Sequence, residues 1–266
     1  MNGLKGVYRE YEPAIIGTAF ILLILLLWQM IPVVMTLSKG MALFFTTPLQ
    51  IVRTFFVLIE QGELQRNFYV SATEFIIGLG LSIAVGLPLG IVVGRSRVMN
   101  ALFDPFITAF NATPRLVFLP LILLWLGIGI WSKIVIVFFG ALFPLLINTY
   151  EGVRNVDRVL VNVVRSFGAN EWQIMKLVVL PNSLPYVITG LRLAIGRAIL
   201  GVVVGEFFGA SEGLGFMIAM AAGNYSVDVV FVGVALFMGI SLILTMSVKM
   251  IESRLSRWRP EEIKTF

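Results

Sequence analysis

The chain has 266 residues, of which 58% are hydrophobic and 13% charged, and its formal net charge at pH 7 is +5. Soluble domains carry about 25% charged residues, so this composition indicates an integral membrane protein. The absence of cysteine and histidine excludes disulfides, thiolate nucleophiles and the most common metal ligand. No GxxxxGK[ST] motif occurs, so the chain has no P-loop for ATP. These absences disfavour enzymes and favour transport.

Six apolar segments are long enough to span a hydrocarbon core about 30 Å thick at a rise of about 1.5 Å per residue. Five of them are uninterrupted: 14–37, 69–94, 131–150, 186–208 and 229–249. The sixth, 105–129, contains Thr113-Pro114-Arg115 and Pro120, but its length fits. The first segment is too long for a signal-peptide core and lacks a cleavage site, so it is predicted to be retained. The predicted fold is an all-α membrane protein with six transmembrane helices.

The basic residues predict the orientation. With both termini in the cytoplasm, cytoplasmic segments hold 13 of the lysines and arginines, outer segments hold 4, and 3 lie within spans. This bias predicts a cytoplasmic segment 1–13, a six-helix domain 14–250 and a cytoplasmic tail 251–266. Arg254, Arg257, Trp258 and Arg259 are expected to anchor the tail at the inner interface. The positive charge is thus a topology signal, and nucleic-acid binding is not predicted.

Three further patterns lie outside the cytoplasmic loops. Thr46-Thr47-Pro48 predicts the start of an outer interfacial helix. A short apolar segment, 216–222, cannot span a bilayer and predicts a re-entrant or outer-gate helix. The second span carries small residues at every fourth position, which predict either tight helix packing or the border of a moving interface. These residues are Gly78, Ser82, Gly86, Gly90 and Gly94.

The largest polar gap between spans, 151–185, carries Arg154, Arg158, Arg165 and Lys176. Its amphipathic part, 155–167, predicts a helix that Gly168 interrupts, and Asn170 can cap a second helix running to about Val178. Leu180-Pro181 and Pro185 are expected to turn the chain back into the membrane. Apolar Phe167, Trp172 and Met175 in a cytoplasmic loop suggest insertion into the groove of a partner. The alternative is a folded loop with no partner.

This loop resembles the coupling loop of the permease subunits of bacterial ATP-binding-cassette (ABC) importers. The family pattern is Glu-Ala-Ala, three residues, Gly, nine residues, Ile-x-Leu-Pro, and Gly168, Val178, Leu180 and Pro181 stand at matching positions. The Glu-Ala-Ala triplet is replaced by Asn-Val-Val at 162–164, so the acidic residue of the family pattern is absent at this position. The resemblance covers some 210 residues and is closest to the nitrate, sulfonate and taurine branch. Further motifs that carry it are 119–129, Phe143-Pro144, 148–153, Gly190-Leu-Arg192, Glu206 and Gly213-Leu-Gly215.

The resemblance implies a type I importer fold in the bacterial inner membrane, crossing it several times. It implies three protein partners: a cytoplasmic ATPase dimer, a second permease copy, identical to this chain, and an extracytoplasmic binding protein. This chain would bind no cofactor and would not be an enzyme, because ATP and Mg would be bound by the ATPase. The residues implied in coupling are Arg165, Ser166, Phe167, Gly168, Ala169, Asn170, Glu171, Trp172, Leu180 and Pro181.

Charges inside the spans form the second set of candidate residues, because a central charge costs about 2.5–3.5 kcal/mol on insertion scales. Arg115 and Arg197 are predicted near mid-depth, and Glu206 lies further outward on the same helix as Arg197. All three are candidates for the translocation path. The two arginines alternatively pair with carboxylates or cap carbonyl groups of a broken helix. Arg192 is expected to be an inner-gate or packing residue.

The sequence therefore predicts the permease subunit of an importer for a small organic or inorganic anion, such as a sulfonate, taurine, an aromatic acid or nitrate. One alternative is a permease of the same family for a neutral heterocycle such as a pyrimidine. Another is a self-contained secondary transporter, which the lack of repeated halves and the few intramembrane carboxylates disfavour. A membrane-embedded enzyme is disfavoured further, because no acidic cluster is apparent that could hold a metal.

Overall fold

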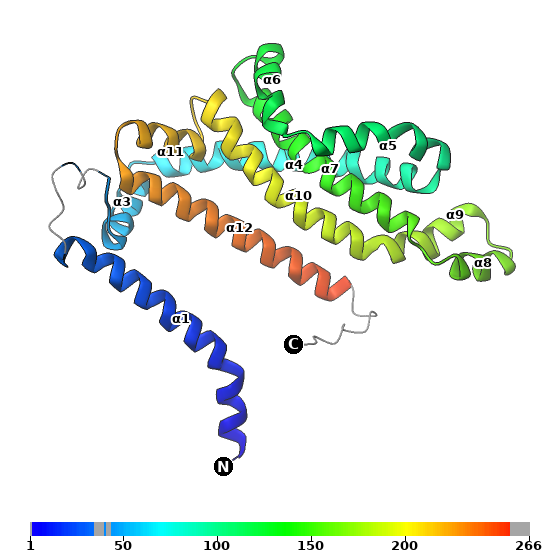
Figure 1. The fold of residues 1–266 in the computed structure, drawn as a ribbon, viewed down its shortest axis with the longest axis horizontal. Coiled ribbons are helices and arrows are strands. Elements are labelled where there is room, and N and C mark those ends of the chain that lie inside the picture. The colour runs from blue at the N-terminus through cyan, green and yellow to red at the C-terminus, as the bar shows by residue number, and fades with distance from the viewer. Residues whose placement is uncertain (1, 35–39, 41–43, 256–266) are drawn as a thin grey trace. The chain divides into compact units, whose positions relative to one another are not determined.

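The computed structural model describes residues 2–34, 40 and 44–255, and every element in these ranges is a helix (Figure 1). The predicted anchor residues Arg257, Trp258 and Arg259 lie outside them. The α-helices are α1 (Asn2–Val34), α3 (Pro48–Glu60), α4 (Glu63–Arg95), α5 (Arg97–Ala112), α6 (Leu119–Leu126), α7 (Ile130–Arg154), α8 (Arg158–Ser166), α9 (Glu171–Ile174), α10 (Leu180–Gly209), α11 (Leu214–Gly223) and α12 (Val227–Leu255). A 3₁₀ helix, η1 (Arg115–Phe118), and a π-helical turn, η2 (Met175–Val179), complete the set.

Five described helical segments are long and apolar enough to cross a membrane: Ile15–Val34, Glu63–Arg95, Ile130–Arg154, Glu171–Gly209 and Val227–Arg254. They correspond to the five uninterrupted segments of the sequence. The sixth predicted segment is divided among α5, η1 and α6. Thr113 ends α5 with an extended backbone, φ −78° and ψ 130°, because the ring of the following Pro114 disfavours helical geometry there. A count of six crossings stays a prediction.

The chain forms two compact units. The first contains the described residues up to Leu64 together with Met217–Val234. Within it, Thr47 caps α3 by accepting a hydrogen bond from the Gln50 amide at 3.3 Å, which confirms the helix start predicted from Thr-Pro. The Trp28 indole donates to the Thr46 carbonyl at 2.9 Å, and Thr54 Oγ1 donates to Asp228 Oδ2 at 2.6 Å. These bonds join α1, α3 and the start of α12.

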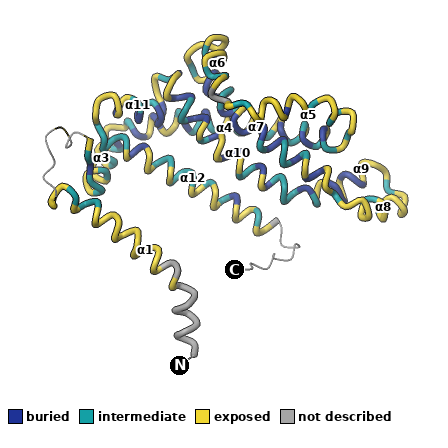
Figure 2. Tube along the Cα trace, viewed as in Figure 1, coloured by how far each residue is buried: buried dark blue, intermediate teal, exposed yellow. Residues whose placement is uncertain are grey.

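The second unit contains Gln65–Phe216 and the rest of α12, and its core lies where α4 and α10 pack on α7. The core side chains are Val137, Ala141 and Leu145 of α7 with Ala194, Ala198 and Val202 of α10. Figure 2 shows the buried residues concentrated along α7 and α10. The remaining apolar surface of these helices is exposed in the isolated protomer, as expected for a protein that lipid surrounds.

The small residues of α4 form its contact with α7, which confirms the packing interpretation of the stripe. An added Cβ on Gly78 would meet Val137, and one on Gly94 would meet Val153. Between these ends, Ser82 Oγ donates to the Phe138 carbonyl at 2.9 Å. Residue numbers rise together along both helices, so α4 and α7 run parallel. The chain between them, residues 96–129, must therefore return over the length of α4.

α10 packs against α7 in the opposite direction. Gly190 lies against Asn148 and Pro144, Gly201 lies against Val137, and Gly205 lies near Lys133. Lipid chains are as apolar as leucine, so membrane helices associate through close backbone approach rather than through the hydrophobic effect. Glycines on both α4 and α10 provide that approach to α7.

A buried polar cluster lies at the end of this three-helix core that contains Glu206. Lys133 of α7 forms an ion pair with Glu74 of α4, and both side chains are almost fully buried. Glu206 of α10 is completely buried and accepts hydrogen bonds from Ser71 Oγ at 2.5 Å and from the Gly215 amide at 2.6 Å. A buried charge without partners would be strongly destabilising, so these contacts are needed to hold the charges there.

The same cluster fixes the loop between α10 and α11. Ser71 Oγ accepts from the Leu214 amide at 2.8 Å, and Asn67 Oδ1 accepts from the Gly213 amide at 2.9 Å. Gly213 has φ +124°, and a Cβ at this position would overlap the Glu206 carboxylate. The left-handed backbone and the lack of room for a Cβ explain the glycine at 213. Three successive loop amides are held by side chains of α4 and α10.

We predict that Gly90→Ala destabilises the chain by about 1–3 kcal/mol through overpacking. A Cβ on Gly90 would lie 2.7 Å from Thr149 Cβ and 2.8 Å from the Leu146 carbonyl oxygen. The measurement is thermal unfolding of the purified chain in detergent. Gly80→Ala on the same helix is the control, because no atom lies within 4 Å of its added Cβ. Equal melting temperatures for the two variants would contradict the packing described here.

We predict that Glu206→Ala loosens the 210–215 loop, because Ser71 and the Gly215 amide lose their acceptor. Each lost hydrogen bond to a charged group is worth about 1.5–3 kcal/mol, so exchange of the Leu214 and Gly215 amides should accelerate by about tenfold or more. Hydrogen–deuterium exchange with mass spectrometry measures this. Glu212→Gln is the control in the same loop, because the contact that Glu212 makes with Arg66 is an exposed ion pair of 3.8 Å, which contributes little to stability. Unchanged exchange in Glu206→Ala would show that the cluster does not hold the loop.

Candidate functional site

The loop between α7 and α10, residues 155–179, is a compact helical structure. Asp157 caps the start of α8, because its side chain accepts a hydrogen bond from the Val159 amide at 2.8 Å. The inner face of α8 carries Val161 and Val164, which pack on a buried cluster beside α7 and η2. The buried members of that cluster are Val153, Ile174, Met175 and Val179. The loop therefore has its own apolar base.

Gly168 ends α8 in the way its sequence position predicts. Its φ is +82°, a left-handed conformation that favours glycine. The Gly168 amide donates to the Arg165 carbonyl at 2.9 Å, and the Ala169 amide donates to the Val164 carbonyl at 3.3 Å. This pair of bonds is a Schellman motif, which reverses the chain within two residues.

α9 starts immediately after the reversal. Asn170 Oδ1 accepts from the Gln173 amide at 2.9 Å, and Gln173 Oε1 accepts from the Asn170 amide at 2.8 Å, forming a capping box. Glu171, the first residue of α9, pairs with Arg165 at 2.8 Å and also with Arg95 at the end of α4. The tip of the loop is thus tied both to α8 and to the end of α4.

Large apolar side chains project from the outer surface of this ordered loop. Phe167 is 86% exposed and Trp172 is 74% exposed, although both flank the rigid turn at Gly168. Val159, Val163 and Leu177 are also exposed. Ser166 Oγ donates to the Val163 carbonyl at 2.7 Å, so its hydroxyl is used within α8. An aromatic pair held out from a fixed base is a surface that can enter a groove of another protein.

The structure corrects the expectation that Leu180-Pro181 turns the chain back into the membrane. α9, η2 and α10 instead form one continuous helical run, Glu171–Gly209. The proline ring would clash with the carbonyl of residue i−4 in a regular α-helix, and the π-helical turn Met175–Val179 widens the backbone where this clash would arise. Asn182 Nδ2 donates to the Val178 carbonyl at 2.8 Å within the same region.

The charged residues of the spans lie in different environments. Arg197 is exposed on α10, and within the described residues it forms no ion pair. Arg192 pairs with Glu252 of α12, which agrees with a packing role. Glu206 faces the buried cluster described above. Arg115 starts η1, but its side chain lies outside the described part of the chain. Arg197 and Glu206 therefore lie in different environments on α10, and a shared site with Arg115 stays a prediction.

Sequence reasoning missed the pairing of Lys133 with Glu74. Lys133 is one of the four basic residues that the predicted orientation places in outer segments. Lys133 belongs to the first turn of α7, where its side chain is almost fully buried. The available signal was a lysine and a glutamate each standing close to the start of a long apolar segment, because such charges need partners.

The comparisons with known proteins agree with this geometry. Residues 86–257 match the family described as binding-protein-dependent transport system inner membrane component. The putative aliphatic sulfonates transport permease protein SsuC of Bacillus subtilis (strain 168) is 37% identical over 240 residues, or 89% of this chain and 84% of that protein. The taurine transport system permease protein TauC of Escherichia coli (strain K12) is 31% identical over 92% of this chain and 90% of that protein.

A formylaminopyrimidine transport permease protein, ThiX of Halalkalibacterium halodurans, is 30% identical over 97% of this chain and all of that protein. Among solved structures, an inward-facing conformation of the MetNI methionine ABC transporter has a similar chain. Its TM-score is 0.64 at 18% identity, and the similarity covers 82% of this chain and 99% of that one. This likeness identifies the fold as that of type I ABC importer permeases.

The family match covers well over half of the chain, and the curated relatives cover most of its length. The several long apolar helices agree with a multi-pass protein of the inner membrane. The chain therefore belongs to the binding-protein-dependent inner membrane components, the permease subunits of ABC importers, in the branch that contains the sulfonate and taurine permeases.

Proposed function

We propose that this chain forms the translocation path for a small organic anion of the sulfonate class, and that the 155–179 loop couples this path to ATP hydrolysis. The observation that carries the proposal is the exposed pair Phe167 and Trp172 on a rigid base. Permease subunits are not enzymes, and the family implies a separate ATPase subunit and a binding protein. ATP and Mg would be bound by the ATPase.

The contact with the ATPase is proposed to use the residues around the Gly168 turn. The Schellman motif fixes Arg165, Phe167 and Ala169, and the capping box fixes Asn170 and Glu171. The large side chains therefore lose little additional freedom when they enter a cleft, which favours binding. Leu180 and Pro181 lie at the start of α10 and would transmit the movement of the loop into the span.

An exposed face of α10 supports a path shared with a second copy of the chain. Leu193, Arg197, Leu200 and Phe207 follow one another at spacings of four, three and seven residues, so they lie on one side of the helix. A charged residue on an apolar helix face needs a polar environment, and a water-filled path between two copies would provide one. We propose an identical second copy, with the Arg197 faces lining the path and both chain termini in the cytoplasm.

The sulfonate class rests on two supports. The SsuC and TauC relatives are named as permeases for aliphatic sulfonates and taurine. Arg197 and Arg115 would offset the cost of moving an anion through the membrane. A neutral pyrimidine is the second candidate, because ThiX is similar over nearly the whole chain. Purification of the complex from native membranes, with mass spectrometry of what is retained, tests the partners. Recovery of this chain alone, active without ATP, would overturn the proposal.

We predict that Trp172→Asp abolishes ATP-driven uptake but leaves folding intact. The side chain is largely exposed, so the free energy of unfolding should change by no more than about 0.5 kcal/mol. Loss of an aromatic anchor typically costs about 2 kcal/mol or more in binding, so ATPase recovery should fall by about tenfold or more. Gly168→Pro should act similarly, because proline cannot adopt φ +82°.

Trp172→Phe is the matched control, because it keeps an aromatic ring without adding charge, and it should retain most uptake. Uptake is measured in proteoliposomes that contain the complete transporter. Normal ATP-driven uptake by both Trp172→Asp and Gly168→Pro would show that this loop is not the coupling element.

We predict that Arg197→Gln lowers uptake of an aliphatic sulfonate by about tenfold, because a hydrogen bond to a charged group is worth about 1.5–3 kcal/mol. Uptake of a neutral analogue should change less. Arg197→Lys retains the charge and serves as the control, and Arg115→Gln tests the second arginine in the same assay. Equal loss for anionic and neutral solutes would indicate a structural role. Uptake of a pyrimidine but of no anion by the wild type would favour the second candidate.

A further inference from the structure

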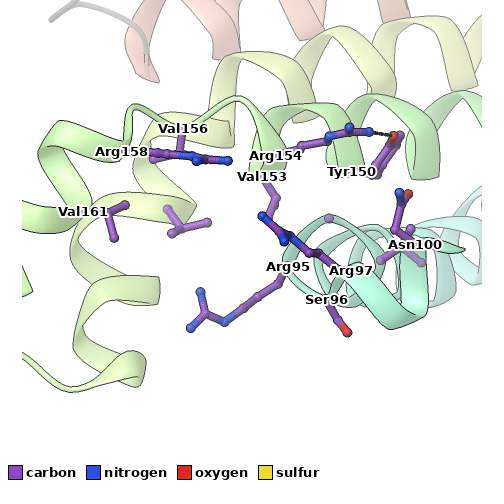
Figure 3. A pocket seen from close by; sticks show the side chains of 13 residues that line it. Arg95, Ser96, Arg97, Asn100, Tyr150, Val153, Arg154, Val156, Arg158 and Val161 are labelled. Atoms are coloured by element: carbon purple, nitrogen blue, oxygen red, sulfur yellow. Dashed lines mark hydrogen bonds between the residues drawn. The ribbon is translucent and has the colours of Figure 1, made fainter.

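A cavity of about 550 Å³ lies where α4 passes into α5, beside the end of α7 and the start of α8. Four of the residues that line it are arginines: Arg95, Arg97, Arg154 and Arg158. Figure 3 shows Arg95 and Arg97 on one side of the cavity and Arg154 and Arg158 on the other. Residues from two parts of the chain thus bring like charges together around one space.

These arginines are incompletely neutralised. Arg95 pairs with Glu171, but Glu171 also pairs with Arg165. In the described part of the chain, Arg97, Arg154 and Arg158 form no ion pair with a carboxylate. Arg154 Nη1 donates to Tyr150 Oη at 2.7 Å, which orients the guanidinium without supplying a negative charge. Like charges gathered around one space repel one another, so an anion bound among them would be stabilising.

Polar groups of the cavity wall add hydrogen-bonding capacity. The side-chain oxygen of Asn100, Oδ1, is buried and has no hydrogen-bond partner among the described residues. The oxygen and the nitrogen of an asparagine amide exchange places when the amide rotates by about 180°. This rotation would place the NH₂ donor where the oxygen now lies. The first turn of α5, a helix of 16 residues, also borders the cavity through Ser96 and Arg97 and contributes its positive end.

The position of the cavity indicates the kind of anion. α4 and α7 are membrane-spanning by length and composition, and they end at Arg95 and Arg154, so the cavity lies at the level where the spans end. Lipid headgroups occupy this level, and in the proposed orientation it is the anionic cytoplasmic leaflet. Val93, Val153 and Val156 line another part of the wall, so an apolar portion of the ligand would also find contacts.

We propose that this cavity binds a phosphate group, carried either by an anionic phospholipid of the cytoplasmic leaflet or by soluble phosphate. Guanidinium groups match phosphate oxygens in bidentate geometry, which makes arginine the preferred side chain for such sites. A phosphate bound here links the α4–α5 junction to the α7–α8 junction. Arg95 lines the cavity and also pairs with Glu171, so the bound phosphate would also affect the tip of the 155–179 loop.

The test uses the full chain, purified in a neutral detergent, titrated with phosphatidylglycerol and observed by native mass spectrometry. We expect one tightly retained phosphatidylglycerol per chain. In the variant Arg97→Gln/Arg154→Gln/Arg158→Gln its affinity should fall by about tenfold or more, since each lost charge-assisted bond is worth at least about 1.5 kcal/mol. Arg53→Gln/Lys249→Gln/Arg254→Gln removes the same charge from exposed positions outside the cavity and should change the affinity by less than about twofold.

A second variant tests the proposal in case the triple arginine variant misfolds. Asn100→Asp is nearly isosteric and places a carboxylate among the arginines, so it should weaken phosphate binding without weakening the fold. Inorganic phosphate at about 10 mM separates the two sources. If phosphate displaces the lipid and raises the melting temperature of the wild type but not of the variants, the ligand is soluble phosphate. If phosphate does not displace the lipid, the ligand is the phospholipid. Binding of lipid and phosphate that is equal in the wild type and both variants would overturn the proposal. The assay needs neither ATPase nor uptake, so its failure would leave the transport function untouched.

Discussion

Close approach of helix backbones to α7 is the constraint on which the rest of this structure depends. In lipid, apolar side chains gain little from meeting one another, so association rests on packing and on interhelical hydrogen bonds. α4 contributes its stripe of small residues to this contact. α10, which runs antiparallel to α7, contributes Gly190, Gly201 and Gly205. Because α4 and α7 run parallel, the broken α5–η1–α6 segment is required to bring the chain back, and because α10 runs antiparallel, the 155–179 loop lies at one end of the core.

That arrangement separates two kinds of polar residue. At one end of the core, Ser71 donates to Glu206, and these two side chains and Asn67 accept hydrogen bonds from the amides of residues 213–215. At the other end, the arginines that line the cavity greatly outnumber their carboxylate partners. A buried and satisfied cluster stabilises a unique conformation, whereas an unsatisfied one is available to a ligand. The two ends of one three-helix core are therefore suited to different tasks.

The features that the sequence predicted depend on local signals. Apolar length predicted the spanning helices, Thr47-Pro48 predicted the start of α3, and Gly168 with Asn170 predicted the break between α8 and α9. The features that it did not predict depend on residues far apart in the chain. The Lys133–Glu74 pair requires the register of α7 on α4, and the arginine cavity requires two junctions to meet. The prediction of a turn at Pro181 was wrong for another reason. The π-helical turn before it accommodates a proline that would clash with the backbone of a regular α-helix.

The unbroken run Glu171–Gly209 has a mechanical consequence. Its 39 residues extend over about 58 Å at about 1.5 Å per residue, and the part from Trp172 to the buried Glu206 covers about 51 Å of this length. A continuous helix moves as one rigid unit, so a displacement at one end reaches the other end. Bending is easiest at the wider π-helical turn. A partner that binds Trp172 and moves it would thus also move the 210–215 loop, whose amides Glu206 and Ser71 hold. This loop lies at the other end of the spanning helix.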